Sequence, residues 1–154
     1  MVDQGPDGRL GADDVLQIHQ LLAYYGHVLD DRDWAALDEV FTTDAVLDYT
    51  RAGATAVLHG LDEVRTFFGG ANHPSAHHTT NIVVAQRDGE VRVRSKFFVP
   101  YTRESHVPKR WFGGTYDDVA VPTAAGWRLS HRTCVGQWQF TTDDEPIPPH
   151  RRTW

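Results

Sequence analysis

The stretch HHTTNIVVAQRDGEVRVRSKFF, residues 77–98, decides the fold of this chain. It holds two runs rich in β-branched and aromatic residues, in which apolar and polar positions alternate as they do in strands with one buried face. The runs meet at Arg87-Asp88-Gly89, a turn with glycine where a positive φ is wanted. The stretch therefore predicts a β-hairpin with strands at 76–86 and 90–103.

Two more long strands are expected after this hairpin, at 110–121 and 126–140. They meet at Ala124-Ala125-Gly126, a second turn signal. Strands of ten residues or more tend to bend and coil. The four strands together predict a strongly curved, mainly antiparallel sheet.

Helical patterns precede the sheet. Apolar residues recur at helical spacing over 13–30, and two shorter helices are expected at 33–41 and 61–68. A strand at 45–50 and its hairpin partner at 54–58 lie between them. Helices followed by antiparallel strands predict an α+β fold, here a cone-shaped roll in which three N-terminal helices and the curved sheet enclose a pocket.

The length of 154 residues suits one domain with a real core. We expect a single domain over 12–140. Residues 1–11 are polar and contain glycine and proline, which predicts a flexible lead-in, and residues 141–154 form a proline-broken C-terminal tail.

Composition excludes several function classes. The net charge of −6 argues against nucleic acid or an anionic membrane as a partner. The single cysteine excludes an internal disulfide, and neither a signal peptide nor a membrane-spanning stretch is recognisable, so we expect a cytoplasmic protein. The five Trp, five Tyr and seven Phe can build rigid apolar walls around a small hydrophobic or polycyclic molecule.

An aspartate and a histidine are the main candidates for catalysis. Asp30 closes the first helix, and His77 opens the first hairpin strand. Asp30 could be a solvated carboxylate at the helix end and His77 a hydrogen-bonded core histidine. If the two meet, a histidine held by a carboxylate is a natural general base near neutral pH. Strand alternation puts His77 and Asn81 on one face and His78 on the other, and a register shift of one residue would exchange the two histidines.

Aromatic and polar side chains are predicted to complete the site. Tyr25 and Tyr49 could be ordinary core residues, or their hydroxyls could polarise a substrate carbonyl and stabilise an enolate. The predicted substrate-binding residues are Asn81, Tyr116, Phe97 and Trp138.

Metal, cofactor and thiol chemistry are not expected. Pro74 breaks the spacing between His73 and His77 as a helical pair, and His77 and His78 face opposite sides of a strand, so these histidines do not make a metal site. Cys134 has no recognisable motif and is interpreted as a small core residue.

The order of four segments carries a resemblance to a known family. They are YYGHVLDDRDWAALDEVF (24–41), TTDAVLDY (42–49), HHTTN (77–81) and GWRLSHRT (126–133). Over roughly residues 12–140 the chain resembles the SnoaL-like branch of the nuclear transport factor 2-like superfamily. The resemblance implies an α+β cone whose pocket serves dehydratases, cyclases, isomerases or plain ligand binders, so the fold alone does not decide the function.

Within that branch the chain is similar to the scytalone dehydratases and the bile-acid 7α-dehydratases. This similarity implies a catalytic aspartate at Asp30, a catalytic histidine at His77, a catalytic tyrosine at Tyr25 and a pocket tyrosine at Tyr49. The chain departs from the scytalone dehydratases at Leu29, where they have tyrosine, and at 113–116, where they carry a second catalytic histidine. The substrate class is therefore not carried over.

These observations predict a cofactor-independent lyase of the dehydratase type. It would remove a proton α to a carbonyl of a small cyclic or polyketide-like substrate, such as those of secondary metabolism, with Asp30 and His77 acting as a pair. An isomerase or a cyclase could use the same residues, and a non-catalytic binder of a small hydrophobic ligand would need the pocket alone. We also expect a homodimer or homotrimer, because a long exposed sheet face needs cover.

Overall fold

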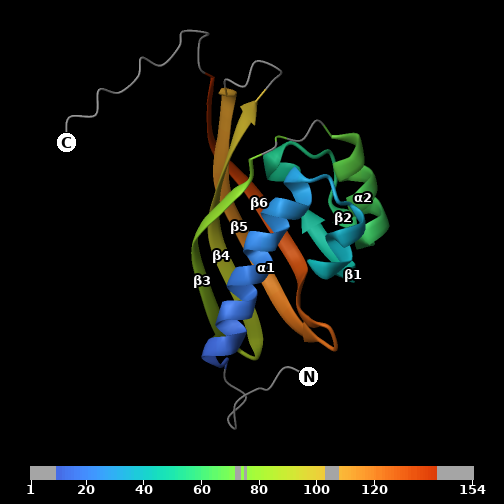
Figure 1. The fold of residues 1–154 in the computed structure, drawn as a ribbon, viewed down its shortest axis with the longest axis vertical. Helices are drawn as coiled ribbons and strands as arrows, with labels where there is room; N and C mark the ends of the chain where they lie inside the picture. Colours follow the sequence, from blue (N-terminus) through green and yellow to red (C-terminus); the bar gives the residue numbers. More distant parts are fainter. Residues whose placement is uncertain (1–9, 72–73, 75, 103–107, 142–154) are drawn as a thin grey trace, which may run out of the picture.

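The computed structural model describes residues 10–71, 74, 76–102 and 108–141. The expected lead-in is described only for its last two residues and the expected tail only for Thr141; the rest of both lies outside the described residues. Six strands form one curved sheet in the order β2-β1-β6-β5-β4-β3. Helix α1 (Ala12–Asp30) lies across one face of this sheet, and helix α2 (Gly60–Gly70) lies beside β1 and β2 (Figure 1).

The α+β class and the mainly antiparallel sheet are confirmed, and the four long strands lie close to their expected positions. The six strands are β1 (Phe41–Asp48), β2 (Leu58–His59), β3 (His78–Arg87), β4 (Glu90–Thr102), β5 (Pro108–Thr123) and β6 (Gly126–Thr141). Their neighbours pair antiparallel, except that β1 runs parallel to β6. Because β2 and β3 are edge strands among the described residues, the sheet does not close.

The expected count of three N-terminal helices is not confirmed, because the second helix is shorter than expected and is not an α-helix. Residues 35–39 form only a short 3-10 helix, and the chain becomes strand β1 at Phe41. Strand β6 is the cause, since Leu129 N–H donates to the Val40 carbonyl at 2.8 Å. Arg128 Nε also donates to the Asp38 carbonyl at 2.9 Å. These contacts draw the backbone into the sheet before a second helical turn can form.

The hairpin partner expected at 54–58 is present only as the short strand β2, which pairs antiparallel with β1 and begins at Leu58. The chain forms a 3-10 turn over Thr50–Ala52, and β2 has only two residues. The Tyr49 carbonyl accepts hydrogen bonds from the N–H groups of Ala52 and Ala54, at 2.8 and 3.0 Å. Gly53 has a φ of 109°, which only glycine adopts readily. The tight turn therefore uses the residues that a longer strand would need.

Helix α1 packs its apolar face on the sheet. Ile18, Leu22 and Leu29 are almost completely buried there, and each such side chain contributes about 1.5–3 kcal/mol of burial free energy. At the start of the helix, Asp14 accepts hydrogen bonds from the N–H of Gly11 at 3.0 Å and from Trp127 Nε1 at 3.1 Å. The second bond fastens α1 to β6.

No helix among the described residues is long and apolar enough to cross a membrane.

A bulge in β3 changes which side chains face the core. Thr80 pairs with Lys96 and Val83 with Arg94, so β3 holds one residue more than β4 over this interval. Asn81 has a φ of 52° within the bulge and is exposed, as is Val83 beyond it. The prediction that His77 and Asn81 share a face is therefore wrong, because the extra residue reverses the alternation.

A second bulge, in β6, acts on Trp138 in the same way. Gly136 pairs with Gly114 and Trp138 with Gly113, so Gln137 is the extra residue. Gly114 faces the interior beside Phe97, which puts Gly113 and the Trp138 ring that covers it on the outer face. Trp138 is 44% exposed. Its predicted place inside the pocket is wrong for this reason.

Candidate active site

Asp30 and His77 come into direct contact. His77 Nδ1 lies 2.6 Å from Asp30 Oδ1, and the backbone N–H of His77 donates to both carboxylate oxygens at 3.1 Å. The His77 side chain is 8% exposed and that of Asp30 is 25% exposed. The last residue of α1 therefore holds both the ring and the backbone of the residue that precedes β3.

This contact fixes the tautomer of the imidazole. A carboxylate can only accept hydrogen bonds, so Nδ1 of His77 carries the proton that Asp30 accepts. In the neutral ring, Nε2 is then the basic nitrogen. Burial lowers the pKa of His77 below 6.5, against the hydrogen bond and charge of Asp30, which raise it. His77 is consequently a neutral imidazole, ready to accept a proton, at neutral pH.

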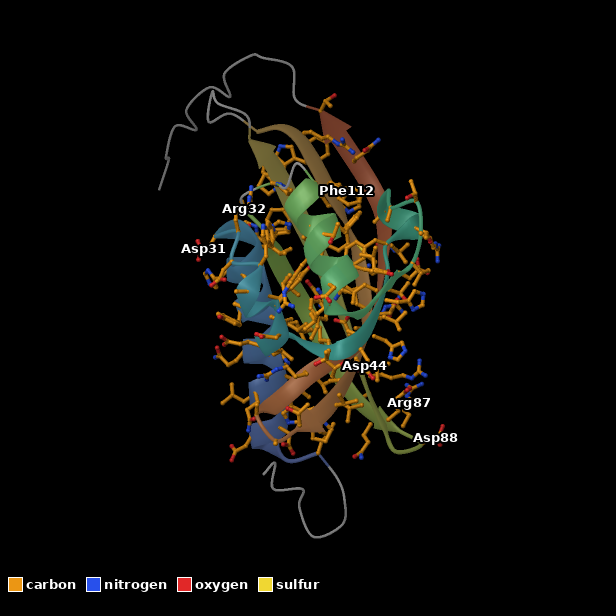
Figure 2. The ribbon with its side chains drawn as sticks, turned by 90° about the vertical axis from the view of Figure 1, so that its right-hand side faces the viewer. Asp31, Arg32, Asp44, Arg87, Asp88 and Phe112 are labelled. Atoms are coloured by element: carbon orange, nitrogen blue, oxygen red, sulfur yellow. The ribbon has the colours of Figure 1, made fainter. Side chains whose placement is uncertain are left out.

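The backbone around the pair is held from two sides. Arg32, with a φ of 59°, donates from Nη1 to the carbonyls of Leu29 at 2.6 Å and Pro74 at 3.1 Å, which ties the end of α1 to the segment before His77. Gly26 lets α1 approach this segment, since a Cβ there would lie 3.1 Å from the His77 carbonyl oxygen. Figure 2 shows Arg32 and Phe112 toward one end of the molecule, and the β3–β4 turn at Arg87 and Asp88 at the other.

His77 lines a cavity of about 120 Å³ between α1, α2 and the sheet. Leu29 and Val99 contribute aliphatic surface, and Pro74 lies near His77 in the wall. Seven aromatic side chains make most of the remaining lining: Tyr25, Tyr49, Phe67, Phe68, Phe97, Phe112 and Tyr116. Such a cavity suits a small, flat, mostly apolar molecule with few polar groups.

Two tyrosine hydroxyls meet at the cavity wall. Tyr25 and Tyr49 are buried, and their hydroxyl oxygens are 2.8 Å apart. Burial raises the pKa of both phenols, and it raises that of Tyr49 well above its usual value. Both groups therefore stay protonated and can donate hydrogen bonds. The structure thus places Tyr25, Tyr49 and His77, with Asp30 behind His77, around one cavity, from α1, the residue after β1 and the residue before β3.

The other predicted residues divide into two groups. Phe97 and Tyr116 line the cavity, with ring centroids 4.5 Å apart in a stacked arrangement. Asn81 and Trp138 do not line it. His78 is exposed and stacks on Phe98 at 4.4 Å, so His77 is the histidine of the cavity.

Sequence reasoning missed a buried ion pair beside the cavity. Arg132 donates from Nε and Nη2 to the two carboxylate oxygens of Asp118, at 2.7 and 2.8 Å, and both side chains are fully buried. The guanidinium carbon lies 4.2 Å from the centre of the Tyr25 ring and 4.1 Å from that of Tyr116. One signal was available in the sequence: Arg132 lies two residues before Cys134, so both side chains point to the same face of β6. The bulge at Ser130 interrupts the alternation of buried residues before Arg132, and the signal is therefore weak.

The cavity thiol is not a nucleophile. Cys134 is buried, and burial raises its pKa to about 12, so almost no thiolate exists at neutral pH. No group of three or more His, Cys, Asp or Glu side chains in the described ranges is placed to hold a metal ion. A larger hollow of about 450 Å³ lies near the β3–β4 turn. Among its described lining residues, only Trp127 and His131 have aromatic rings. We place the candidate site in the smaller cavity, because His77, Tyr25 and Tyr49 all line it.

Comparison with known proteins agrees with this architecture. Residues 11–133 match the sequence profile of the SnoaL-like domain. The chain belongs to the SnoaL-like domain family. An uncharacterised protein of Mycobacterium tuberculosis is 32% identical to it over 126 residues, which are 77% of this chain and 82% of the relative.

Solved structures share the fold of this SnoaL-like domain. A protein of Novosphingobium aromaticivorans, proposed to be an aromatic ring hydroxylase, has a TM-score of 0.73 and 26% identity, covering 87% of this chain and 96% of its own. A proposed scytalone dehydratase of the same species has a TM-score of 0.69 and 21% identity, covering 94% and 100%. ActVI-ORFA of Streptomyces coelicolor has a TM-score of 0.69 and 18% identity, covering 79% and 96%. The last two show the fold alone.

Proposed function

We propose that this SnoaL-like domain is a cofactor-independent lyase of the dehydratase type, acting on a small cyclic compound with an enolisable carbonyl and a hydroxyl in the β position. The observation that carries the proposal is the Asp30–His77 contact of 2.6 Å at the wall of an aromatic cavity. A positioned base and hydroxyl donors are the groups that proton removal next to a carbonyl requires.

The first step is removal of a proton from carbon. Nε2 of His77 takes the α-proton, and the C–H electron pair moves into an enolate. Asp30 stabilises the imidazolium that forms. A hydroxyl of the Tyr25–Tyr49 pair donates to the enolate oxygen, where the negative charge gathers.

The second step is loss of water. The His77 imidazolium gives its proton to the β-hydroxyl as the carbon–oxygen bond breaks, and the enolate electrons form a carbon–carbon double bond conjugated with the carbonyl. The substrate loses one molecule of water, and His77 returns to its neutral form. A single histidine serves as base and then as acid, as general acid–base catalysis allows.

Deuterium exchange tests the common first step. A panel of one- and two-ring β-hydroxy ketones is incubated with the protein in D₂O and followed by NMR and by absorbance of the conjugated product. Exchange at the α-carbon with water loss supports the lyase. Exchange with migration of a double bond or with ring closure would favour the isomerase or cyclase, and no exchange across the panel would contradict the proposal.

The protonation of His77 gives a first prediction. Because burial lowers the pKa of His77, NMR titration of its ring is expected to give a pKa below 6.5, with the basic form present above it. In Asp30→Asn the hydrogen bond and charge that raise the pKa are weakened or lost, so the value should fall further. A pKa above 6.5 in the wild type, or a rise in the variant, would contradict the assigned balance of burial and charge.

We also propose that the domain forms a homodimer or homotrimer through the outer face of the sheet. Trp138, Phe140 and Val83 are 44%, 52% and 62% exposed. Trp138 and Phe140 stack with centroids 5.9 Å apart, and Phe140 stacks on Trp111 at the same distance. A cluster of exposed aromatic rings of this kind is typical of an association surface.

Light scattering at micromolar concentration checks this second prediction. The wild type is expected to be an oligomer, and Phe140→Arg should give a monomer because a buried, unpaired charge opposes association. Leu16→Arg is the control, since Leu16 is 59% exposed but lies on α1. A monomeric wild type, or dissociation by the control alone, would remove this assignment.

A further inference from the structure

The buried Arg132–Asp118 ion pair leaves one guanidinium nitrogen, Nη1, out of the contact with the carboxylate. Nε and Nη2 of Arg132 donate to Asp118, while Nη1 is buried and makes no hydrogen bond of ordinary geometry among the described residues, although Arg132 interacts with the Tyr25 phenol closely enough to lower its pKa. A buried N–H without a partner costs about 1–3 kcal/mol. Such a group is uncommon in a core and calls for an explanation, of which a functional role is one.

The guanidinium is packed between two rings of the cavity wall. Its carbon lies 4.2 Å from the centre of Tyr25 and 4.1 Å from that of Tyr116. Both rings line the cavity, and Arg132 itself does not. A ligand that touches the tyrosines is therefore separated from the positive charge by one layer of side chains.

The hydroxyl pair can give a proton to a ligand. Tyr25 and Tyr49 carry two hydroxyl protons between them, and the contact of 2.8 Å uses one. The second proton is available to a ligand oxygen in the cavity. A hydrogen bond donated from this pair strengthens when the ligand oxygen is negative.

We propose that the Tyr25–Tyr49 end of the cavity is an oxyanion-binding subsite, made electropositive by the Arg132 guanidinium that packs behind the tyrosine rings. Its ligands are small planar phenols and enolisable ring ketones, bound as their anions. Arg132 acts through the tyrosines and is a positioning residue. This inference rests on the proposed function in one respect, because the enolate formed by His77 is such an anion.

Charge supports this assignment. Burial lowers the pKa of Arg132, but the Asp118 carboxylate outweighs it and raises this pKa well above the usual value, so the guanidinium stays charged. The same charge lowers the pKa of Tyr25 against the effect of burial. The pair with Asp118 is neutral overall, yet the cation is the member packed against the rings. An anion bound at the hydroxyls is therefore stabilised by the Arg132 charge across the Tyr25 ring.

Binding of p-nitrophenol tests the subsite without any turnover. Its anion absorbs visible light and its neutral form does not, so one titration reports affinity and ionisation together. Nitrobenzene, with the same ring and no acidic hydroxyl, is the control ligand. The wild type is expected to bind the phenol as its anion.

The key variant is the double replacement Arg132→Met with Asp118→Leu. It removes both charges together, and swapping a buried ion pair for apolar groups of similar volume is often neutral for stability. Affinity for the phenolate should fall about tenfold, as expected for losing a nearby opposite charge, while nitrobenzene affinity stays unchanged. Tyr25→Phe should weaken phenolate binding as well.

Three results would overturn the subsite: equal phenolate affinity in wild type and a folded double variant, binding of the neutral phenol only, or no binding of the phenol. The lyase proposal fails separately. Phenolate binding that persists in wild type and in His77→Asn, with no proton exchange by any substrate, would leave the subsite standing and remove the lyase. If the wild type turns over a substrate but binds the phenolate equally well without Arg132, the lyase proposal stands and the subsite is removed.

Discussion

The His77→Ala variant is expected to lose about 10²–10⁴-fold in turnover while keeping its fold, because general-base catalysis contributes about that much. The loss should appear mainly in kcat, since His77 is one lining residue and the aromatic walls that bind the substrate are unchanged. Deuterium exchange at the α-carbon should fall in parallel with water loss. Circular dichroism and urea unfolding would establish that the variant is folded.

Asp30→Asn should also lose most of its turnover. An amide cannot stabilise the imidazolium as a carboxylate does, and its NH₂ group can select the wrong ring tautomer. Since the two side chains act as a unit, the double variant should be little worse than His77→Ala alone. Fully additive losses would contradict a shared role for the pair.

The chain supplies matched controls for both substitutions. His78 is next to His77 but exposed, so His78→Ala should leave turnover nearly unchanged. Asp31 follows Asp30 and is exposed at the end of α1, as Figure 2 shows, so Asp31→Asn should also be neutral. A His77→Ala enzyme of normal activity, or equal damage by His78→Ala, would refute the assigned base.

Breaking the buried ion pair is expected to have the largest effect on stability. Asp118→Ala should lower the free energy of unfolding by about 3–5 kcal/mol, because it leaves the Arg132 guanidinium buried without its partner. Urea unfolding followed by tryptophan fluorescence measures this loss. The double replacement Arg132→Met with Asp118→Leu should recover most of it, since neither charge is then buried.

Asp117 provides the comparison for this stability loss. It lies beside Asp118 in β5, and it pairs with Arg94 at 3.6 Å with both side chains more than half exposed. An exposed ion pair contributes about 0–1 kcal/mol, so Asp117→Ala should be nearly neutral. Similar losses for Asp117→Ala and Asp118→Ala would contradict the assigned importance of burial.

Local patterns were enough to predict the sheet but not where its side chains point. Period-two alternation and the glycine turns at Gly89 and Gly126 placed the long strands within a few residues. The extra residues at Asn81 and Gln137 leave no clear mark in the pattern, and each reverses the faces that follow. For this reason the predicted pocket positions of Asn81 and Trp138 were wrong, although both residues are in strands.

Contacts between distant segments explain the remaining differences. The second helix is reduced to a short 3-10 helix because β6 binds the Val40 carbonyl, a contact that no local propensity encodes. Asp30 and His77 were predicted to meet with the help of the family resemblance, and their contact spans 47 residues. Asp118 and Arg132 were missed because the sequence shows two ordinary charged residues, and only the tertiary fold buries them together.

One helix carries both a tyrosine of the cavity wall and the aspartate that supports the base. Tyr25 and Asp30 are five residues apart on α1, roughly 7.5 Å along its axis, and Gly26 between them rests on the His77 backbone. Any substitution that slides or tilts α1 therefore moves the oxygen donor and the support of the base in concert. In a screen of random variants, inactive substitutions should spread along the whole buried side of α1, and their loss of activity would not by itself mark those positions as chemical participants.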